Sequence, residues 1–195
     1  MINAVVLAAG ASTRMGSQKL LLPLAGEPLV RRTVRAVSSA GFDEVLVVVG
    51  FEHEKVEAAL EGLGARIAVN PDYGTGMGSS FRTAVGALPD ESEAAMFALA
   101  DQPLVTAADY RRLLEAWRAK REGIVRVSYG EVTAPPHLFA REFFPELAAL
   151  EHGARPVLRR HADRTIVLPF APELLLDIDT PEDYERASAL LSTGR

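Results

Sequence analysis

Short, continuously apolar runs that alternate with helical patterns restrict the fold of this 195-residue chain more than any other feature. Such runs occupy 4–8, 45–49 and 94–100, and each has the length of a strand rather than of a buried helix. Strands that are apolar on both faces belong to parallel sheets that helices cover on both sides. The segment 29–40 carries valines at helical spacing and ends at a glycine. The sequence therefore predicts an α/β architecture with a mostly parallel central sheet.

The remaining elements are predicted from periodicity and turn residues. Thr106 and Thr180 each stand three residues before an aspartate, which is the spacing of a capping box that opens a helix. The helix after Thr106 is expected to run to about Lys120, and the helix after Thr180 to Leu191. We also expect helices at 54–60, 81–88, 140–150 and 154–161, and strands at 66–69, 124–128, 131–133, 165–168 and 174–178.

Composition narrows the classes of function. With 48% hydrophobic and 24% charged residues, the chain fits one compact domain, 1–195. A net charge of −5 and the absence of an arginine and lysine run argue against a nucleic-acid-binding face. No apolar run approaches the roughly 18 residues of a membrane helix, and no export signal is evident, so we expect a cytoplasmic protein without a membrane partner. The chain has no cysteine, which excludes disulfides and thiolate metal sites.

The first apolar run leads into the small-residue loop 8–12, and two cations, Arg14 and Lys19, follow it. Little side-chain bulk lets backbone N–H groups approach phosphate oxygens, and the cations add contacts to the same anion. Two common phosphate loops do not fit this sequence. The Gly-x-Gly-x-x-Gly loop does not fit because Ser12 stands in the place of its second glycine. The Walker loop does not fit because Gly16 is not adjacent to Lys19. The loop is interpreted as a polyphosphate site, with a plain strand-to-helix turn as the alternative.

A second loop, 72–82, has glycines at Gly74, Gly76 and Gly78, followed by two serines. Glycines allow the backbone to approach a flat ring closely. Ser79 and Ser80 can bond a ligand, or one of them can cap the following helix. The loop therefore predicts a site for a flat ligand, and helix capping remains the alternative.

Two aspartates each follow an apolar run and are expected at the carboxyl ends of strands. Asp101 follows 94–100 and Asp179 follows 174–178. A few carboxylates together with water and substrate phosphates satisfy Mg²⁺, so this pair predicts a magnesium site. Turn formation and helix capping are the alternatives for these residues. Asp177 is a weaker candidate or a structural partner.

Two further groups of residues give weaker indications. Gly153-Ala154-Arg155 precedes a predicted helix and either forms a second anion pocket or simply starts that helix. The histidines lack the paired spacing of zinc ligands and are interpreted as surface or substrate-pocket residues. They are His53, His137, His152 and His161.

With these motifs in place, the chain resembles nucleotidyltransferases with a glycosyltransferase-A-type Rossmann-like fold, and specifically the molybdenum cofactor cytidylyltransferase group. The shared motifs are Leu7-Ala8-Ala9-Gly10-x-Ser12-x-Arg14-Met15-Gly16 with Lys19, Asn70-Pro71-Asp72, Gly76-Met77-Gly78-Ser79-Ser80, Asp101-Gln102-Pro103-Leu104 and Asp177-Ile178-Asp179-Thr180-Pro181-Glu182-Asp183. The first motif is common to many NTP transferases, and the later ones narrow the family.

The resemblance implies a three-layer fold, with a nucleotide-binding part at about 1–105 and an acceptor-binding part at about 106–195. It implies that Ala9 favours cytosine over guanine, and that Asp101 and Asp179 hold Mg²⁺. The residues implied to contact the nucleotide are Leu7, Ala8, Ala9, Gly10, Ser12, Arg14, Lys19, Gly76, Gly78, Ser79, Ser80 and Asp101, of which Arg14, Lys19 and Asp101 are also the implied catalytic residues.

The implied reaction transfers CMP from CTP to a molybdopterin-type acceptor and releases pyrophosphate. A molybdenum enzyme or its chaperone is the implied protein partner. Related chains carry a glycine-rich stretch where this one has the charged, β-branched segment 130–139, and this difference bears on the acceptor. The alternatives are an NTP transferase for another phosphorylated acceptor, such as a sugar phosphate, guanylyl transfer, or a non-catalytic molybdenum cofactor chaperone.

Overall fold

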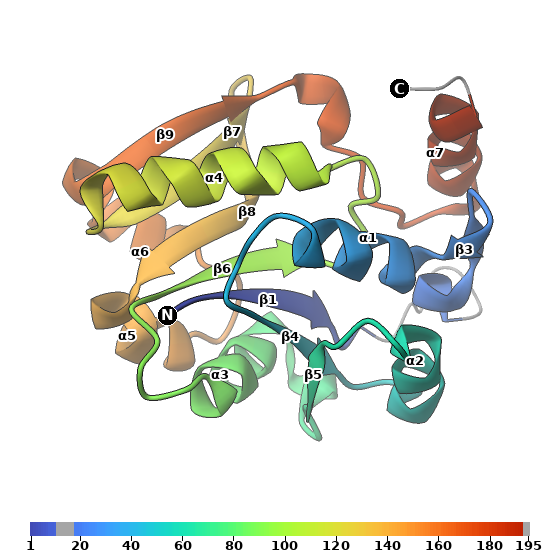
Figure 1. The fold of residues 1–195 in the computed structure, drawn as a ribbon, viewed down its shortest axis with the longest axis horizontal. Coiled ribbons are helices and arrows are strands. Elements are labelled where there is room, and N and C mark those ends of the chain that lie inside the picture. Colours follow the sequence, from blue (N-terminus) through green and yellow to red (C-terminus); the bar gives the residue numbers. More distant parts are fainter. Residues whose placement is uncertain (11–17, 193–195) are drawn as a thin grey trace.

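The computed structural model describes residues 1–10 and 18–192, and its central feature is a seven-stranded sheet (Figure 1). The strand order is β5-β4-β1-β6-β8-β7-β9, and a two-stranded sheet joins β2 to β3. The strands are β1 Ile2–Ala8, β2 Pro23–Leu24, β3 Glu27–Pro28, β4 Glu44–Val49, β5 Arg66–Val69, β6 Ala94–Leu99, β7 Ile124–Tyr129, β8 Val132–Ala140 and β9 Thr165–Phe170.

Helices cover both faces of this sheet. Figure 1 shows α1 and α4 on the near face, with α3, α5 and α6 behind the sheet. The helices are α1 Leu29–Ser38, α2 His53–Leu60, α3 Met77–Ala87, α4 Ala107–Lys120, α5 Phe144–Ala148, α6 Arg155–Arg160 and α7 Pro181–Ser192. Short 3-10 turns are η1 Lys19–Leu21, η2 Tyr73–Thr75, η3 Arg141–Phe143, η4 Ala162–Arg164 and η5 Pro172–Leu174. These layers confirm the predicted three-layer α/β fold.

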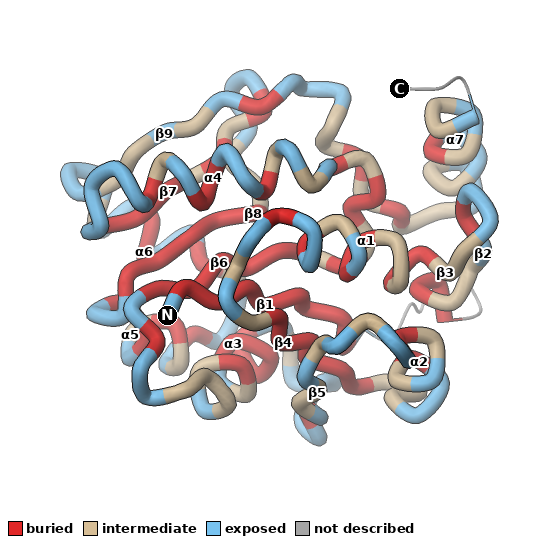
Figure 2. The backbone as a smooth tube through the Cα atoms, viewed as in Figure 1, coloured by how far each residue is buried: buried red, intermediate tan, exposed pale blue. Residues whose placement is uncertain are grey.

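The pairing of the strands determines where a ligand can bind. β1 pairs in parallel with β4 on one side and with β6 on the other, and these three strands are almost entirely buried (Figure 2). The chain leaves β1 through α1 on one face and enters β6 from α3 on the other. Such a reversal of winding opens a crevice at the carboxyl ends of the strands. The small-residue loop that follows β1 starts at this crevice.

The antiparallel strand β8 makes the sheet mixed. It pairs with β6 on one side and with β7 on the other, so the strand predicted at 131–133 extends to Ala140. The helix expected over 140–150 is shorter, because strand pairing with β6 extends to Ala140; the 3-10 turn η3 and the short α5 follow it.

The helix expected at 81–88 is present but begins earlier, at Met77, and its Gly78 packs against the backbone at 150–151, just after α5. One expectation was wrong. The segment 174–178 forms no strand; instead, Ile178 donates its amide hydrogen to the Asp101 carbonyl at 3.1 Å. Within the described part of the chain, none of the helices combines the length and the apolar character that crossing a membrane requires.

Candidate active site

The ammonium group of Lys19 lies between two carboxylates at the carboxyl edge of the sheet. Its Nζ donates to Asp101 Oδ2 at 2.7 Å and to Asp179 Oδ1 at 2.8 Å. Lys19 is only 9% exposed, whereas the Asp179 side chain is 47% exposed. The structure thus brings together three residues that are far apart in the sequence, with one carboxylate facing the solvent.

Local contacts fix Lys19 in this position. Gln18 precedes the turn η1 and is buried, and its Nε2 donates to the Phe51 carbonyl at 2.9 Å, beyond the end of β4. Lys19 is the first residue of η1, so its backbone is held against the neighbouring strand end. Sequence reasoning missed Gln18, and only its position next to Lys19 could have indicated it.

Asp101 is held at the end of β6 by the strand and helix that pack against it. The amide of Ala100 donates to the Leu7 carbonyl at 3.1 Å, which extends the pairing with β1. The hydroxyl of Thr33, in α1, donates to the Ala100 carbonyl at 3.0 Å. The turn that carries Asp101 is therefore fixed from two sides.

Asp179 reaches the same site from the other end of the chain. The bond from Ile178 to the Asp101 carbonyl places the two aspartates side by side. Immediately afterwards, Asp183 accepts hydrogen bonds from the amides of Asp179 and Thr180, and Thr180 Oγ1 accepts from the Asp183 amide, which is the predicted capping box. These bonds start α7 and orient the backbone of Asp179.

Charge governs the protonation of this cluster. Burial alone would lower the pKa of Lys19, but the Asp101 and Asp179 carboxylates outweigh it and raise the pKa above 10.5. Burial raises the pKa of Asp177, and the neighbouring Asp101 and Asp179 raise it further. Asp177 accepts a hydrogen bond from Gln102 Nε2 at 2.8 Å, so it acts as a structural partner at this edge.

The cluster suits a hard divalent cation. Asp101 Oδ1 is buried and has no hydrogen-bond partner among the described residues. Asp101 and Asp179 supply the carboxylate oxygens that Mg²⁺ prefers. No group of three or more histidine, cysteine or acidic side chains with metal-binding geometry occurs within 1–10 and 18–192. Water and substrate phosphates would therefore complete the coordination.

The loop 72–82 is held together mainly by its own contacts. Asn70 is buried and donates from Nδ2 to Ser79 Oγ at 2.9 Å and to Ser80 Oγ at 3.1 Å. Ser79 in turn donates to the Gly76 carbonyl at 2.8 Å. The two serines are buried, so the structure places them as supports of the loop. Asn70 was noticed only as part of a motif, and its role depends on these contacts.

The glycines of this loop differ in what they do. A Cβ on Gly78 would lie 2.0 Å from the Leu150 carbonyl oxygen, and the Gly78 amide already donates to the Glu151 carbonyl at 3.2 Å. Gly78 is thus required for packing, and its contacts give no support to a direct role in nucleotide binding. Gly76 is half-buried with a φ of 115°, a conformation that favours glycine, and it precedes the first residue of α3.

The start of the first loop packs tightly against β4. Leu7 and Ala8 are buried as the last residues of β1, and Ala9 is 6% exposed. A Cβ on Gly50 would lie 2.9 Å from Ala9 Cβ and 2.7 Å from Tyr73 Cβ, so little space remains beside Ala9. Gly10 is exposed. Ser12 and Arg14 lie outside the described residues.

An apolar cavity of about 390 Å³ lies against the strands β1, β6 and β8. Leu7 and Leu99 line it, and each stands two residues before a residue of the site. Its wall includes Phe81, Phe97 and Phe139, whose rings pack with centroid distances of 5.0 and 6.0 Å. The cavity therefore offers aromatic surface, which suits a flat organic group.

His137 also lines this cavity and is neutral. Burial lowers its pKa to about 3, and the nearby positive charge of Arg126 lowers it as well. The Val127 amide donates to His137 Nδ1 at 3.2 Å, so the neutral ring carries its proton on Nε2. His152 lines the same cavity. His53 pairs instead with Glu57, and His161 with Glu146.

Comparisons with known proteins identify the family. The model of the MobA-like NTP transferase domain matches residues 4–165. The purine catabolism protein PucB of Bacillus subtilis is 32% identical over 205 residues, which cover 96% of each protein. Rv0371c of Mycobacterium tuberculosis H37Rv, solved in complex with manganese, superposes with a TM-score of 0.78 at 29% identity, covering 96% of this chain and 98% of the other.

A match with a longer protein covers only part of that protein. The bifunctional protein GlmU of Burkholderia lata is 34% identical over 134 residues. That match covers 68% of this chain, and the chain spans only 29% of the length of GlmU. Because the family model covers most of the chain and PucB matches along nearly its whole length, this protein belongs to the MobA-like NTP transferase family.

Proposed function

We propose that this nucleotidyltransferase moves CMP from CTP to a molybdopterin-type acceptor and releases pyrophosphate. The observation that carries the proposal is the cluster of Lys19, Asp101 and Asp179 at the carboxyl edge of a sheet whose strands β1 and β6 also line an apolar cavity. The cluster supplies positive charge and metal-type ligands, and the cavity supplies a surface for a flat ring. The nucleotide is assigned to the part at about 1–105 and the acceptor to about 106–195.

In the proposed reaction an oxygen of the acceptor phosphate attacks the α-phosphorus of CTP. A new P–O bond forms, the bond from the α-phosphorus to the bridging oxygen breaks, and pyrophosphate leaves with the electron pair. The acceptor is already an anion, so no strong general base is required. Lys19 would turn from the carboxylates towards the triphosphate and stabilise the charge that develops there. Arg14 is proposed to act beside it.

Asp101 and Asp179 are the residues proposed to hold Mg²⁺. When bound, the metal would neutralise phosphate charge and orient the triphosphate. The manganese complex of Rv0371c supports a divalent metal in this family. The role of the protein is to fix the two carboxylates, which it does through the Ile178 bond and the capping box. Alignment of the two phosphates then supplies much of the remaining rate enhancement.

Base selection is assigned to Ala9, with Gly10, Ser12 and Gly76 in the nucleotide-binding wall. Ala9 already approaches the backbone at Gly50, and its methyl group narrows the space for a base. A smaller pyrimidine would fit that space better than guanine. The variant Ala9→Gly is expected to raise the use of GTP relative to CTP.

The cavity lining favours a flat heterocyclic acceptor over a sugar phosphate. Aromatic and aliphatic side chains dominate it, whereas a sugar exposes many hydroxyl groups that would lose their water-mediated hydrogen bonds there. A pyrophosphate-release assay that combines CTP, GTP or ATP with molybdopterin or with sugar phosphates tests this choice. We expect the largest rate with CTP and molybdopterin.

The same assay distinguishes the enzyme from a non-catalytic carrier. The Lys19→Ala variant is expected to lower turnover by about 10²-fold, a size typical for the loss of one stabilising charge. Unimpaired pyrophosphate release by this variant would contradict the proposed role of Lys19. Nucleotide binding by the wild-type protein without turnover on any acceptor would favour the carrier.

A further inference from the structure

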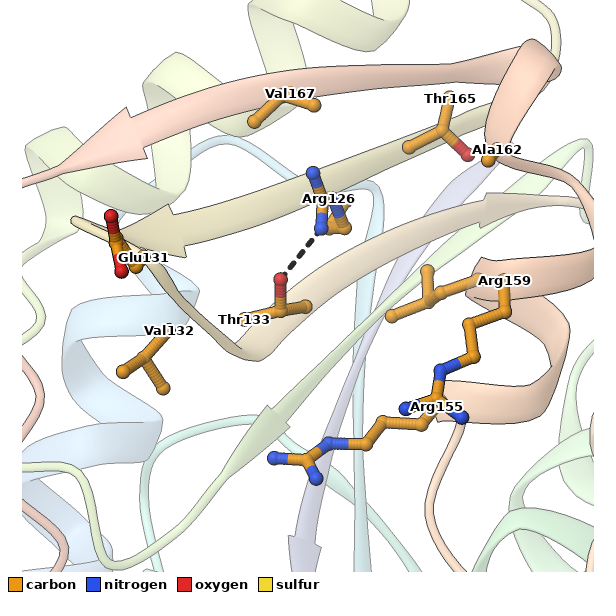
Figure 3. Close-up of a pocket in the computed structure, with 10 residues that line it drawn as sticks. Arg126, Glu131, Val132, Thr133, Arg155, Arg159, Ala162, Thr165 and Val167 are labelled. Carbon is orange, nitrogen blue, oxygen red and sulfur yellow. Dashed lines mark hydrogen bonds between the residues drawn. The ribbon is translucent and has the colours of Figure 1, made fainter.

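A second pocket, of about 550 Å³, lies on the outer side of the sheet next to α6 (Figure 3). Arg126 projects into it from β7, and Arg155 and Arg159 reach it from α6. Thr165 and Val167 of β9 form the opposite wall. Val132 and Thr133 of β8 also line it, so the pocket is built mainly from three strands and a helix that come from different parts of the sequence.

The three arginines carry no carboxylate partner within the described residues. Arg126 donates to Thr133 Oγ1 at 2.6 Å, which orients its guanidinium group without neutralising it (Figure 3). Neighbouring cations behave differently, since Arg160 pairs with Glu146 and Arg164 pairs with Glu142. Only the exposed Glu131 brings negative charge to the pocket lining. Guanidinium groups in one pocket repel one another, and a bound anion would remove that repulsion.

The arginine pocket adjoins the apolar cavity of the active site. Thr133, Arg155 and Leu158 line both spaces, so a single molecule can extend from one to the other. The positive field of Arg126 also reaches the cavity, because it contributes to the low pKa of His137. The charges of the outer pocket and the ring-binding surface therefore belong to one continuous site.

We propose that the arginine pocket is an anion site that binds a phosphate or carboxylate group beside the apolar cavity. The planar, forked guanidinium of arginine matches phosphate and carboxylate oxygens. This anion site does not depend on the proposed function.

Binding of inorganic phosphate tests the anion site without any turnover. Isothermal titration at low ionic strength compares the wild-type protein, the double variant Arg155→Gln/Arg159→Gln, and the control Arg160→Gln. Arg159 and Arg160 are adjacent and both exposed, but only Arg159 lines the pocket, so the control removes a neighbouring charge without changing the lining. Phosphate binding in the nucleotide loop is common to all three proteins and cancels in the comparison.

We expect the double variant to lose at least about tenfold in phosphate affinity, since one charge-assisted hydrogen bond contributes more than that factor. The control should bind phosphate like the wild-type protein. Equal phosphate binding by all three proteins would overturn the anion site. Both sets of side chains are exposed, so the fold should persist, and equal thermal midpoints without phosphate would verify this.

Discussion

The two charged regions of this protein differ in whether their cations are paired with carboxylates. In the active-site cluster, Lys19 is buried and bonded to both carboxylates. In the outer pocket, Arg155 and Arg159 are exposed and carry no ion pair in the described structure. The first region pairs its cation with carboxylates of the protein, and the second leaves its cations for another molecule.

This difference affects how each region would bind a ligand. At the cluster, a triphosphate with its metal must replace contacts that Lys19 already makes, so binding is an exchange of partners. At the outer pocket a bound anion adds new contacts. It displaces water but breaks no contact between protein groups. The cluster can therefore be selective at the cost of rearrangement, whereas the pocket is preorganised for an oxyanion.

The largest effect on activity is expected for Asp101, because the exchange of partners at the cluster requires this carboxylate. Asp101→Asn should lower kcat for pyrophosphate release by about 10²–10³-fold, because it removes a charge from the metal site and from the pair with Lys19. Asp177→Asn is the matched control, since it keeps an oxygen for Gln102 and should stay within about tenfold of the wild-type rate. Equal rates for the two variants would contradict the proposed role of Asp101.

Packing beneath the nucleotide loop should give the next largest effect. Gly78→Ala places a methyl group against the Leu150 carbonyl, and because backbone cannot yield easily, we expect a loss of about 2–3 kcal/mol in the free energy of unfolding. Gly74→Ala is the control, since its Cβ would have no neighbour within 4 Å, and it should change stability by less than about 0.5 kcal/mol. Urea denaturation of the two variants measures the difference.

Two single variants, one from each region, test whether the two regions differ in how their cations affect stability. Lys19→Met leaves two neighbouring carboxylates without their cation and should destabilise the fold by about 1–2 kcal/mol, less than for a fully buried pair because Asp179 is half-exposed. Arg159→Gln removes a cation with no ion pair and should change stability by less than about 0.5 kcal/mol. Equal losses in urea denaturation would remove the distinction between the regions.

The smallest effect concerns the bonds that orient Asp179. The Thr180 hydroxyl, followed by the amides of Asp179 and Thr180, holds the pKa of Asp183 below its ordinary value of 3.8. A lowered pKa stabilises the fold above pH 3.8 and loses this contribution as the pH falls through the folded-state pKa. Asp183→Ala should lower the free energy of unfolding by about 1 kcal/mol at pH 7, and by progressively less below pH 3.8. A loss that is constant from pH 7 to pH 3 would exclude the carboxylate as its source.

Local sequence signals predicted much of the fold. The continuous apolar runs at 4–8, 45–49 and 94–100 became β1, β4 and β6, and both capping boxes formed as expected. The errors lie where partners distant in the sequence decide the local structure. The strand β8 extends because β6 pairs with it, and Gly78, near the start of α3, packs against the distant backbone at 150–151.

At the candidate site, too, the sequence predicted some features correctly, and contacts between distant residues decided the others. Asp101 and Asp179 were selected because each follows an apolar run, but the run before Asp179 is not a strand. A single backbone bond from Ile178 to Asp101 brings the two together. Ser79 and Ser80 were selected as ligand contacts, yet their hydroxyl groups bond to Asn70. Sequence position indicated which residues gather at the crevice, and not what each of them touches.

By itself, the sequence determined the α/β architecture, the capped helices and the residue types that meet at the carboxyl edge of the sheet. These features follow from hydrophobic periodicity and from hydrogen bonds between near neighbours, which a linear pattern records. Only the tertiary structure decided that Lys19 bridges Asp101 and Asp179, and that three arginines from β7 and α6 share one pocket. Such contacts join residues from distant parts of the chain, and they exist only once the packed sheet and helices fix the distances between them.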